Sequence, residues 1–94
     1  MSDARIAQCK QLLSDEGINP ASTIEYDVNG TIHTLSLQEI IETYMQASEE
    51  AQLVFVAAMH KAVDAKTMGI QKFFEGMGKL LLMSRYSEGD ITSV

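Results

Sequence analysis

The chain lacks most of the features that hold a small protein together covalently. Its 94 residues include one cysteine, Cys9, one proline and no tryptophan. A single thiol excludes a disulfide within the chain and a zinc site built on cysteine pairs. A domain of this size buries only about 60–65% of the surface that its unfolded chain exposes. We therefore expect a second subunit to supply part of the stabilisation.

Basic residues are also scarce. Seven lysines and arginines stand against 13 aspartates and glutamates, for a net charge of −6, and the excess of acid lies almost wholly in residues 1–50. Binding to duplex DNA needs a basic footprint, which this composition does not provide. The charge distribution is compatible with protein partners and with subunits that pack an acidic end against a basic one.

The sequence contains neither a membrane span nor a secretory signal. The longest unbroken apolar run, residues 53–59, has seven residues, whereas a helix needs about 18–20 to cross a bilayer. The first residues do not show the positively charged segment, apolar segment and cleavage site that are typical of a secretory signal peptide. Together with the single thiol, these absences predict a cytoplasmic protein without a membrane partner.

Catalytic motifs are missing as well. Residues 76–79 read Gly-Met-Gly-Lys, but a phosphate-binding loop also needs a glycine where Phe73 stands and a serine or threonine where Leu80 stands. His33 and His60 fall in different predicted elements and lack the spacing of metal ligands. We therefore predict no catalytic residues, no metal site and no cofactor.

The first element that the sequence does predict is a helix over residues 3–16. Ile6, Cys9 and Leu13 recur at helical spacing and form one apolar stripe, so Cys9 is expected to be a core residue. Gly17 suits the left-handed position that ends a helix, and Pro20 prevents its continuation.

A β-hairpin is predicted for residues 23–35. Asn29 and Gly30 suit a two-residue type I′ turn, in which both residues need positive φ. This turn pairs Tyr26 with His33 and alternates apolar with polar side chains, so one face is expected to be buried and the other exposed. The buried face would carry Ile24, Tyr26, Val28, His33 and Leu35.

Helices are predicted after the hairpin. Ser36 and Glu39 have the spacing of a capping box, which marks a helix start. Residues 53–59 are apolar on every side of a helix and would then need cover on every side. Residues 70–81 repeat apolar side chains at helical spacing and predict a final amphipathic helix. Residues 48–50, Ser-Glu-Glu, could kink or restart the helix that begins at Ser36. Whether residues 37–83 form two long helices, with a break near 66–69, or one long kinked helix stays open.

Together these elements predict an α+β fold that is mostly helical. It consists of an N-terminal helix, one β-hairpin and a helical core that is shared between subunits of an oligomer. We expect a single small domain over residues 1–84 and a flexible C-terminal tail over residues 85–94.

The favoured functional interpretation is a small acidic, non-catalytic protein-binding module that acts as a homodimer or larger homo-oligomer. An adaptor, a regulator or a small inhibitor of the kind that phages and mobile elements encode would fit. Buried aromatic anchors usually dominate interface energies, so the partner-binding residues are predicted on the last helix: Phe73, Phe74, Met77 and Leu81. The competing interpretation places both phenylalanines in the core of the monomer.

A second interpretation is a small-ligand or nucleotide-binding protein with a pocket between subunits. Its candidate contacts are Tyr26, His33, Lys61, Lys72 and Lys79. The lysines would share a face if the C-terminal helices were continuous, but a lysine stripe without interleaved aromatic residues is more typical of a solvated helix face.

Overall fold

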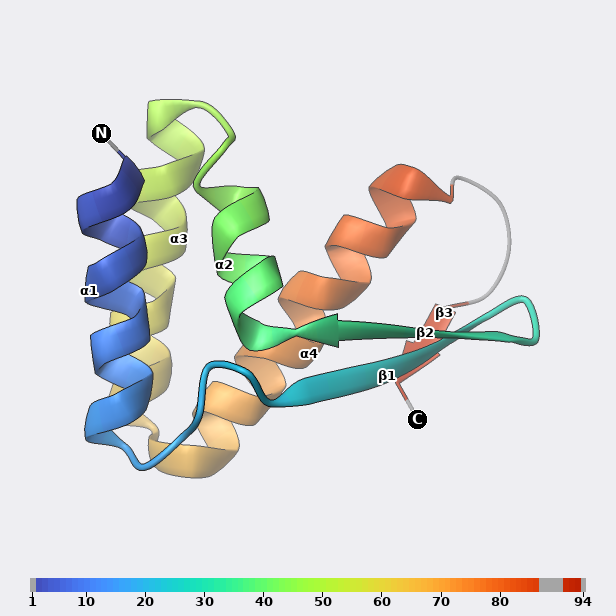
Figure 1. Ribbon diagram of the computed structural model, residues 1–94, viewed down its shortest axis with the longest axis horizontal. Helices are drawn as coiled ribbons and strands as arrows, with labels where there is room; N and C mark the ends of the chain where they lie inside the picture. The colour runs from blue at the N-terminus through green and yellow to red at the C-terminus, as the bar shows by residue number, and fades with distance from the viewer. Residues whose placement is uncertain (1, 87–90, 94) are drawn as a thin grey trace.

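A computed structural model describes residues 2–86 and 91–93 of the chain. In chain order this part contains α1 (Ser2–Asp15), β1 (Thr23–Val28), β2 (Thr31–Ser36), α2 (Leu37–Tyr44), α3 (Glu49–Asp64), α4 (Lys66–Arg85) and β3 (Ile91–Ser93) (Figure 1). The fold is α+β and mostly helical, as the sequence predicts. Helices α1 and α3 lie side by side at one end, and the sheet runs across α4 towards the other end.

Helix α1 ends as its sequence predicts. Gly17 adopts a φ of 74°, which costs a glycine little because it has no Cβ. The Gly17 amide then donates to the Ser14 carbonyl at 3.0 Å, and the Ile18 amide donates to the Leu13 carbonyl at 2.9 Å. This pair of bonds is a Schellman motif, which turns the chain away from α1 towards the hairpin.

The hairpin has the predicted register. Asn29 and Gly30 have φ values of 53° and 87°, and Tyr26 lies opposite His33. Tyr26, Val28 and Leu35 are buried, whereas Ile32 on the opposite face is half exposed. The alternation of apolar and polar residues therefore sets which face of the sheet packs on the helices.

A third strand completes the sheet, and the sequence pattern gives no sign of it. Strand β3 pairs antiparallel with β1, so the strand order is β2-β1-β3. Ile91 of β3 is buried opposite Val28. These residues belong to the segment 85–94, for which a flexible tail is expected; residues 87–90 lie outside the described part. Strand β3 covers the edge of β1 that the hairpin alone would leave unpaired.

Three helices follow the hairpin, and α3 begins at Glu49, where the sequence allows a kink or restart. Ser36 and Ser48 cap α2 and α3 by accepting hydrogen bonds from the Glu39 and Ala51 amides, at 3.0 and 3.2 Å. The second break falls at Ala65, just before the predicted range of 66–69. Gly69 lies inside α4, where a Cβ atom would meet the Ala62 carbonyl oxygen at 2.8 Å. Glycine at 69 thus allows α4 to leave α3 at a sharp corner.

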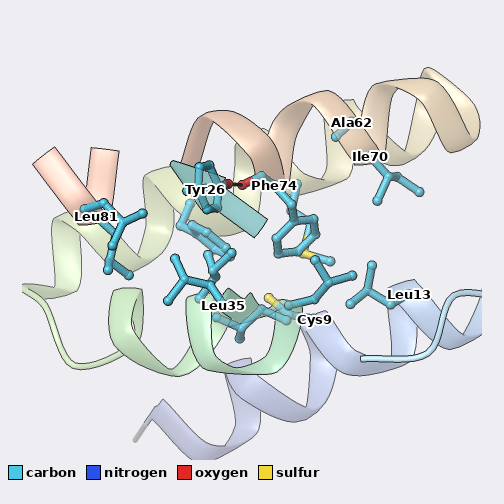
Figure 2. Close-up of a cluster of buried hydrophobic side chains, with 14 of the residues drawn as sticks. Cys9, Leu13, Tyr26, Leu35, Ala62, Ile70, Phe74 and Leu81 are labelled. Carbon is cyan, nitrogen blue, oxygen red and sulfur yellow. Dashed lines mark hydrogen bonds between the residues drawn. The ribbon is translucent and has the colours of Figure 1, made fainter. Parts of the chain in front are cut away.

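The hydrophobic core lies between the sheet and the helices (Figure 2). It draws on every helix and strand of the described part, and its largest fully buried side chains are Tyr26 and Phe74. Cys9 is also fully buried, and burial raises the pKa of its thiol to about 11. The thiol is therefore protonated at neutral pH and packs as a small apolar group.

Tyr26 fixes the sheet on α4. Its hydroxyl shares its proton between the backbone carbonyls of Glu75, at 2.8 Å, and Phe74, at 3.2 Å; Figure 2 shows the contact with Phe74. Its ring lies so close to Gly78 that a Cβ atom there would collide with the hydroxyl and ring carbons. Gly76, one half-turn away on the helix, has open space where its Cβ would be. Glycine is required at 78 for packing, and at 76 it is not.

These two glycines predict opposite effects of alanine. Gly78→Ala should destabilise the fold by about 1–3 kcal/mol, because the new methyl group displaces Tyr26 from α4. Gly76→Ala should stabilise it by about 0.5–1 kcal/mol, since alanine favours a helix and meets nothing. Urea denaturation followed by circular dichroism measures both. Equal stabilisation by the two substitutions would show that Tyr26 does not pack on Gly78.

Tyr26 also predicts how stability changes in alkali. Desolvation, with Glu75 and Tyr44 as lesser causes, raises the pKa of Tyr26 from 10.0 to about 12. The hydroxyl ionises less readily in the folded protein than in the unfolded chain. Its contribution to stability is therefore complete below the pKa of the unfolded chain and is lost as the pH rises through the pKa of the folded protein. The free energy of unfolding should therefore fall between about pH 10 and pH 12.

Tyr26→Phe isolates this effect, because Cys9 titrates in the variant as it does in the original protein. The variant should be less stable at neutral pH by about 1–2 kcal/mol, since the buried hydrogen bond that the hydroxyl shares between two carbonyls is lost. Its stability should decline less steeply in alkali. Equal alkaline slopes in urea titrations of the two proteins would contradict the burial of the hydroxyl.

Candidate protein-interaction surface

The outer side of α3 carries the exposed part of the apolar run 53–59. Phe55 and Met59 are buried, as the apolar pattern predicts. Leu53 and Val54, however, are 52% and 64% exposed, and Ala57 is exposed as well. The chain itself therefore covers only one side of this run, although its sequence predicts that it needs cover all round.

Neighbouring helices hold α3 on its other sides. Arg5 of α1 donates to Gln52 and to Glu49, both at 2.9 Å. The hydrogen bond and charge of Arg5 lower the pKa of the Glu49 carboxyl. On the side towards α4, the rings of Phe55 and Phe73 lie 5.2 Å apart. We call the remaining solvent-facing side the α3 outer face and define it as Glu50, Leu53, Val54, Ala57 and Lys61, all of which are exposed.

The four predicted partner-binding residues of the last helix divide into two groups. Phe74 and Leu81 are buried in the chain's own core, at 0% and 5% exposure, so a partner cannot reach them in this conformation. Phe73 and Met77 are partly buried against the same core. The competing interpretation, which places Phe73 and Phe74 in the core of the monomer, agrees with the full burial of Phe74 and the partial burial of Phe73.

Other residues of α4 face solvent instead. Leu80 and Met83 are 53% and 50% exposed. The sequence pattern places Leu80 in the same apolar repeat as Ile70 and Phe74, because helical periodicity alone does not show how wide the buried stripe is. The exposed side of α4 also carries Lys72 and Lys79.

The five candidate ligand contacts are only partly brought together. Tyr26, Lys72 and Lys79 line one surface depression of about 370 Å³ between α4 and the sheet, together with Glu75, Gly76 and Thr92. His33 lies elsewhere, with its ring 5.0 Å from that of Tyr86, and Lys61 is on the α3 outer face.

The depression has little that would recognise a ligand. The Tyr26 hydroxyl already donates to two backbone carbonyls, and Glu75 lies between the two lysines along the helix. Both lysines are exposed, and exposed charges bind ligands weakly without converging buried partners. The depression is thus a weaker candidate than the α3 outer face.

Metal and membrane sites do not emerge from the geometry. Across residues 2–86 and 91–93, no three or more histidine, cysteine, aspartate or glutamate side chains are grouped so as to hold a metal ion. No helix in the same ranges is long and apolar enough to cross a membrane.

Comparisons with models of protein families, with curated proteins and with solved structures found no match for this chain. The candidate surface therefore rests on the structure alone. The spacing of its residues is visible in the sequence, because Glu50, Val54, Ala57 and Lys61 follow the alternation of four and three that marks one helix face. The apolar run 53–59 conceals this spacing, because its buried and exposed members look alike.

The burial of Phe74 and the exposure of Leu80 give a direct test of the division within α4. Phe74→Ala should destabilise the fold by about 3–5 kcal/mol, because it removes a fully buried aromatic ring. Leu80→Ala, the control on the exposed side of the same helix, should change stability by less than about 0.5 kcal/mol. Thermal unfolding of both variants gives the comparison. If the Phe74→Ala protein were as stable as the original, Phe74 would not be a core residue and would again be a candidate for partner binding.

Proposed function

We propose that this protein is a small, non-catalytic protein-binding module that works as a homo-oligomer. The observation that carries the proposal is the exposure of Leu53 and Val54 on α3, beside the buried Phe55 and Met59 of the same apolar run. Exposed apolar residues that gather on one helix face are typical of protein contacts. The small size of the chain supports the same conclusion, since a second subunit adds buried surface that one chain cannot provide.

Binding of a further protein is supported by α4. Its exposed side combines the apolar residues Leu80 and Met83 with the basic residues Lys72 and Lys79. A partner with apolar and acidic groups would complement this combination. The acidic composition of the whole chain supports a protein partner over duplex DNA. Whether the module is an adaptor, a regulator or an inhibitor depends on that partner. The buried cysteine thiol, which forms no disulfide, is compatible with the cytoplasm.

A second candidate function, small-ligand binding, is favoured by one observation. Three of its five predicted contacts, Tyr26, Lys72 and Lys79, line the same depression. We rank it lower because the Tyr26 hydroxyl is engaged by the backbone and the two lysines are exposed.

The proposal predicts that the protein is not a monomer in solution. Light scattering or sedimentation equilibrium at micromolar concentrations should give a mass at least twice the 10.4 kDa of one chain. The mass should fall on dilution, as expected for an interface that uses exposed rather than core residues. A mass of 10.4 kDa throughout the micromolar range would refute self-association.

A further inference from the structure

The α3 outer face has a regular seam. Glu50, Val54, Ala57 and Lys61 are separated by four, three and four residues, which is the spacing that keeps side chains on one face of paired helices. Leu53 lies beside this seam and is 52% exposed. The two apolar residues at the centre are thus flanked along the helix by an acid on one side and a base on the other, about 16 Å apart.

The two charged residues of the seam have no side-chain partner among the described residues. Glu50 and Lys61 are exposed, and the single ion pair among the described residues joins Arg5 to Glu49 instead. No hydrogen bond from either side chain is present in the described part of the structure. Both are free to pair with another molecule.

A second copy of α3 complements this seam when it runs in the opposite direction. A two-fold axis at the level of the peptide between residues 55 and 56 places Glu50 opposite Lys61 of the second copy. The same axis places Val54 opposite Ala57 of the second copy, so a larger side chain meets a smaller one. Each contact occurs twice, because a two-fold interface uses the same patch on both subunits. A parallel pair would instead bring Glu50 onto Glu50 and Lys61 onto Lys61.

We propose that two copies of this chain associate through antiparallel α3 helices, with Val54 packed on Ala57 and Glu50 paired with Lys61 across the interface. The proposal rests on the proposed homo-oligomeric function and names its surface, direction and register. The small side chain of Ala57 lets the two helix axes approach closely, since their separation depends on the residues at the contact. The opposed macrodipoles of antiparallel helices favour the same direction.

Helix electrostatics within one chain account for the sign of the seam charges but not for their alignment. Glu50, with Glu49, is an acid of the first turn of α3, and Lys61 is the base of its last turn; such charges stabilise any helix. The macrodipole sets no preference for one face, whereas Glu50 and Lys61 both lie in line with Val54 and Ala57.

The exposed side of α4 does not offer the same complementarity to a second copy. Lys72 and Lys79 accompany Leu80 and Met83 there, and an α4 pair in which these exposed sides face each other in register 72 to 79 would bring lysines of the two chains together. Like charges in contact oppose association. Self-association is therefore assigned to α3, and α4 is left to a different partner.

Charge reversal tests the register. Glu50→Lys and Lys61→Glu should each weaken the dimer about tenfold or more, because each turns two attractive pairs into two repulsive ones. The double variant Glu50→Lys/Lys61→Glu should dissociate as the original protein does, since the pairs are restored with their signs exchanged. Both substitutions oppose the macrodipole of α3, so recovery in the double variant cannot come from a more stable helix. Sedimentation equilibrium measures each dissociation constant, and circular dichroism confirms that each variant is folded.

Matched controls change the net charge equally at other exposed sites. Glu25→Lys on β1 and Arg85→Glu in the last turn of α4 should leave the dissociation constant unchanged. If the original protein dimerises but the α3 single variants dimerise equally well, the α3 assignment is overturned while the proposed homo-oligomer stands. Single variants that dissociate without recovery in the double variant overturn the antiparallel register. An original protein that stays monomeric overturns both.

Discussion

The hydroxyl of Tyr26 joins the sheet to α4, and the positions of the other elements depend on that contact. It donates to the carbonyls of Phe74 and Glu75. In a regular helix these carbonyls would accept hydrogen bonds only from backbone amides of the same helix. The ring reaches those carbonyls because Gly78 has no side chain in its way. A two-stranded hairpin alone is marginally stable in water, so this attachment, with the pairing of β3 to β1, makes the hairpin part of a folded domain.

The same attachment decides which surfaces remain exposed. Because the sheet packs on one side of α4 and the aromatic cluster of Phe55, Phe73 and Phe74 fills the space towards α3, the core residues of both helices are used up within one chain. Helix α1 covers a second side of α3 through Arg5. The outer side of α3 keeps its apolar residues but receives no cover among the described residues. The proposed interaction surface thus lies where the apolar content of the chain exceeds what the chain buries.

Local features of the fold were predictable from the sequence because each depends on a few neighbouring residues. The turn at Asn29 and Gly30, the stop at Gly17 and the cap at Ser36 each follow from backbone chemistry at the site itself. The register of the hairpin followed from its turn and was confirmed.

Features that depend on distant residues were not predictable. Strand β3 has three residues, and its pairing with β1 joins parts of the chain more than 60 residues apart. The sequence also could not show which phenylalanine is core, since Phe73 and Phe74 are adjacent and their burial is set by α3 and the sheet. For the site, the apolar run 53–59 indicated that a helix would need outside cover, but not which side; only the positions of α1 and α4 reveal that Val54 and Ala57 face outward. Three of the five candidate ligand residues did converge, because the sheet crosses α4 beside its lysines.

The central claim is that the uncovered side of α3 binds a second copy of the chain. Backbone amide chemical shifts, recorded by NMR from micromolar to millimolar concentration, test this claim residue by residue. The structure predicts that shifts move with concentration along α3, most at Glu50, Val54, Ala57 and Lys61, while the outward face of the sheet stays unchanged. Shifts that move on α4 or along the edge of β2 instead, or that do not move at all, would contradict it.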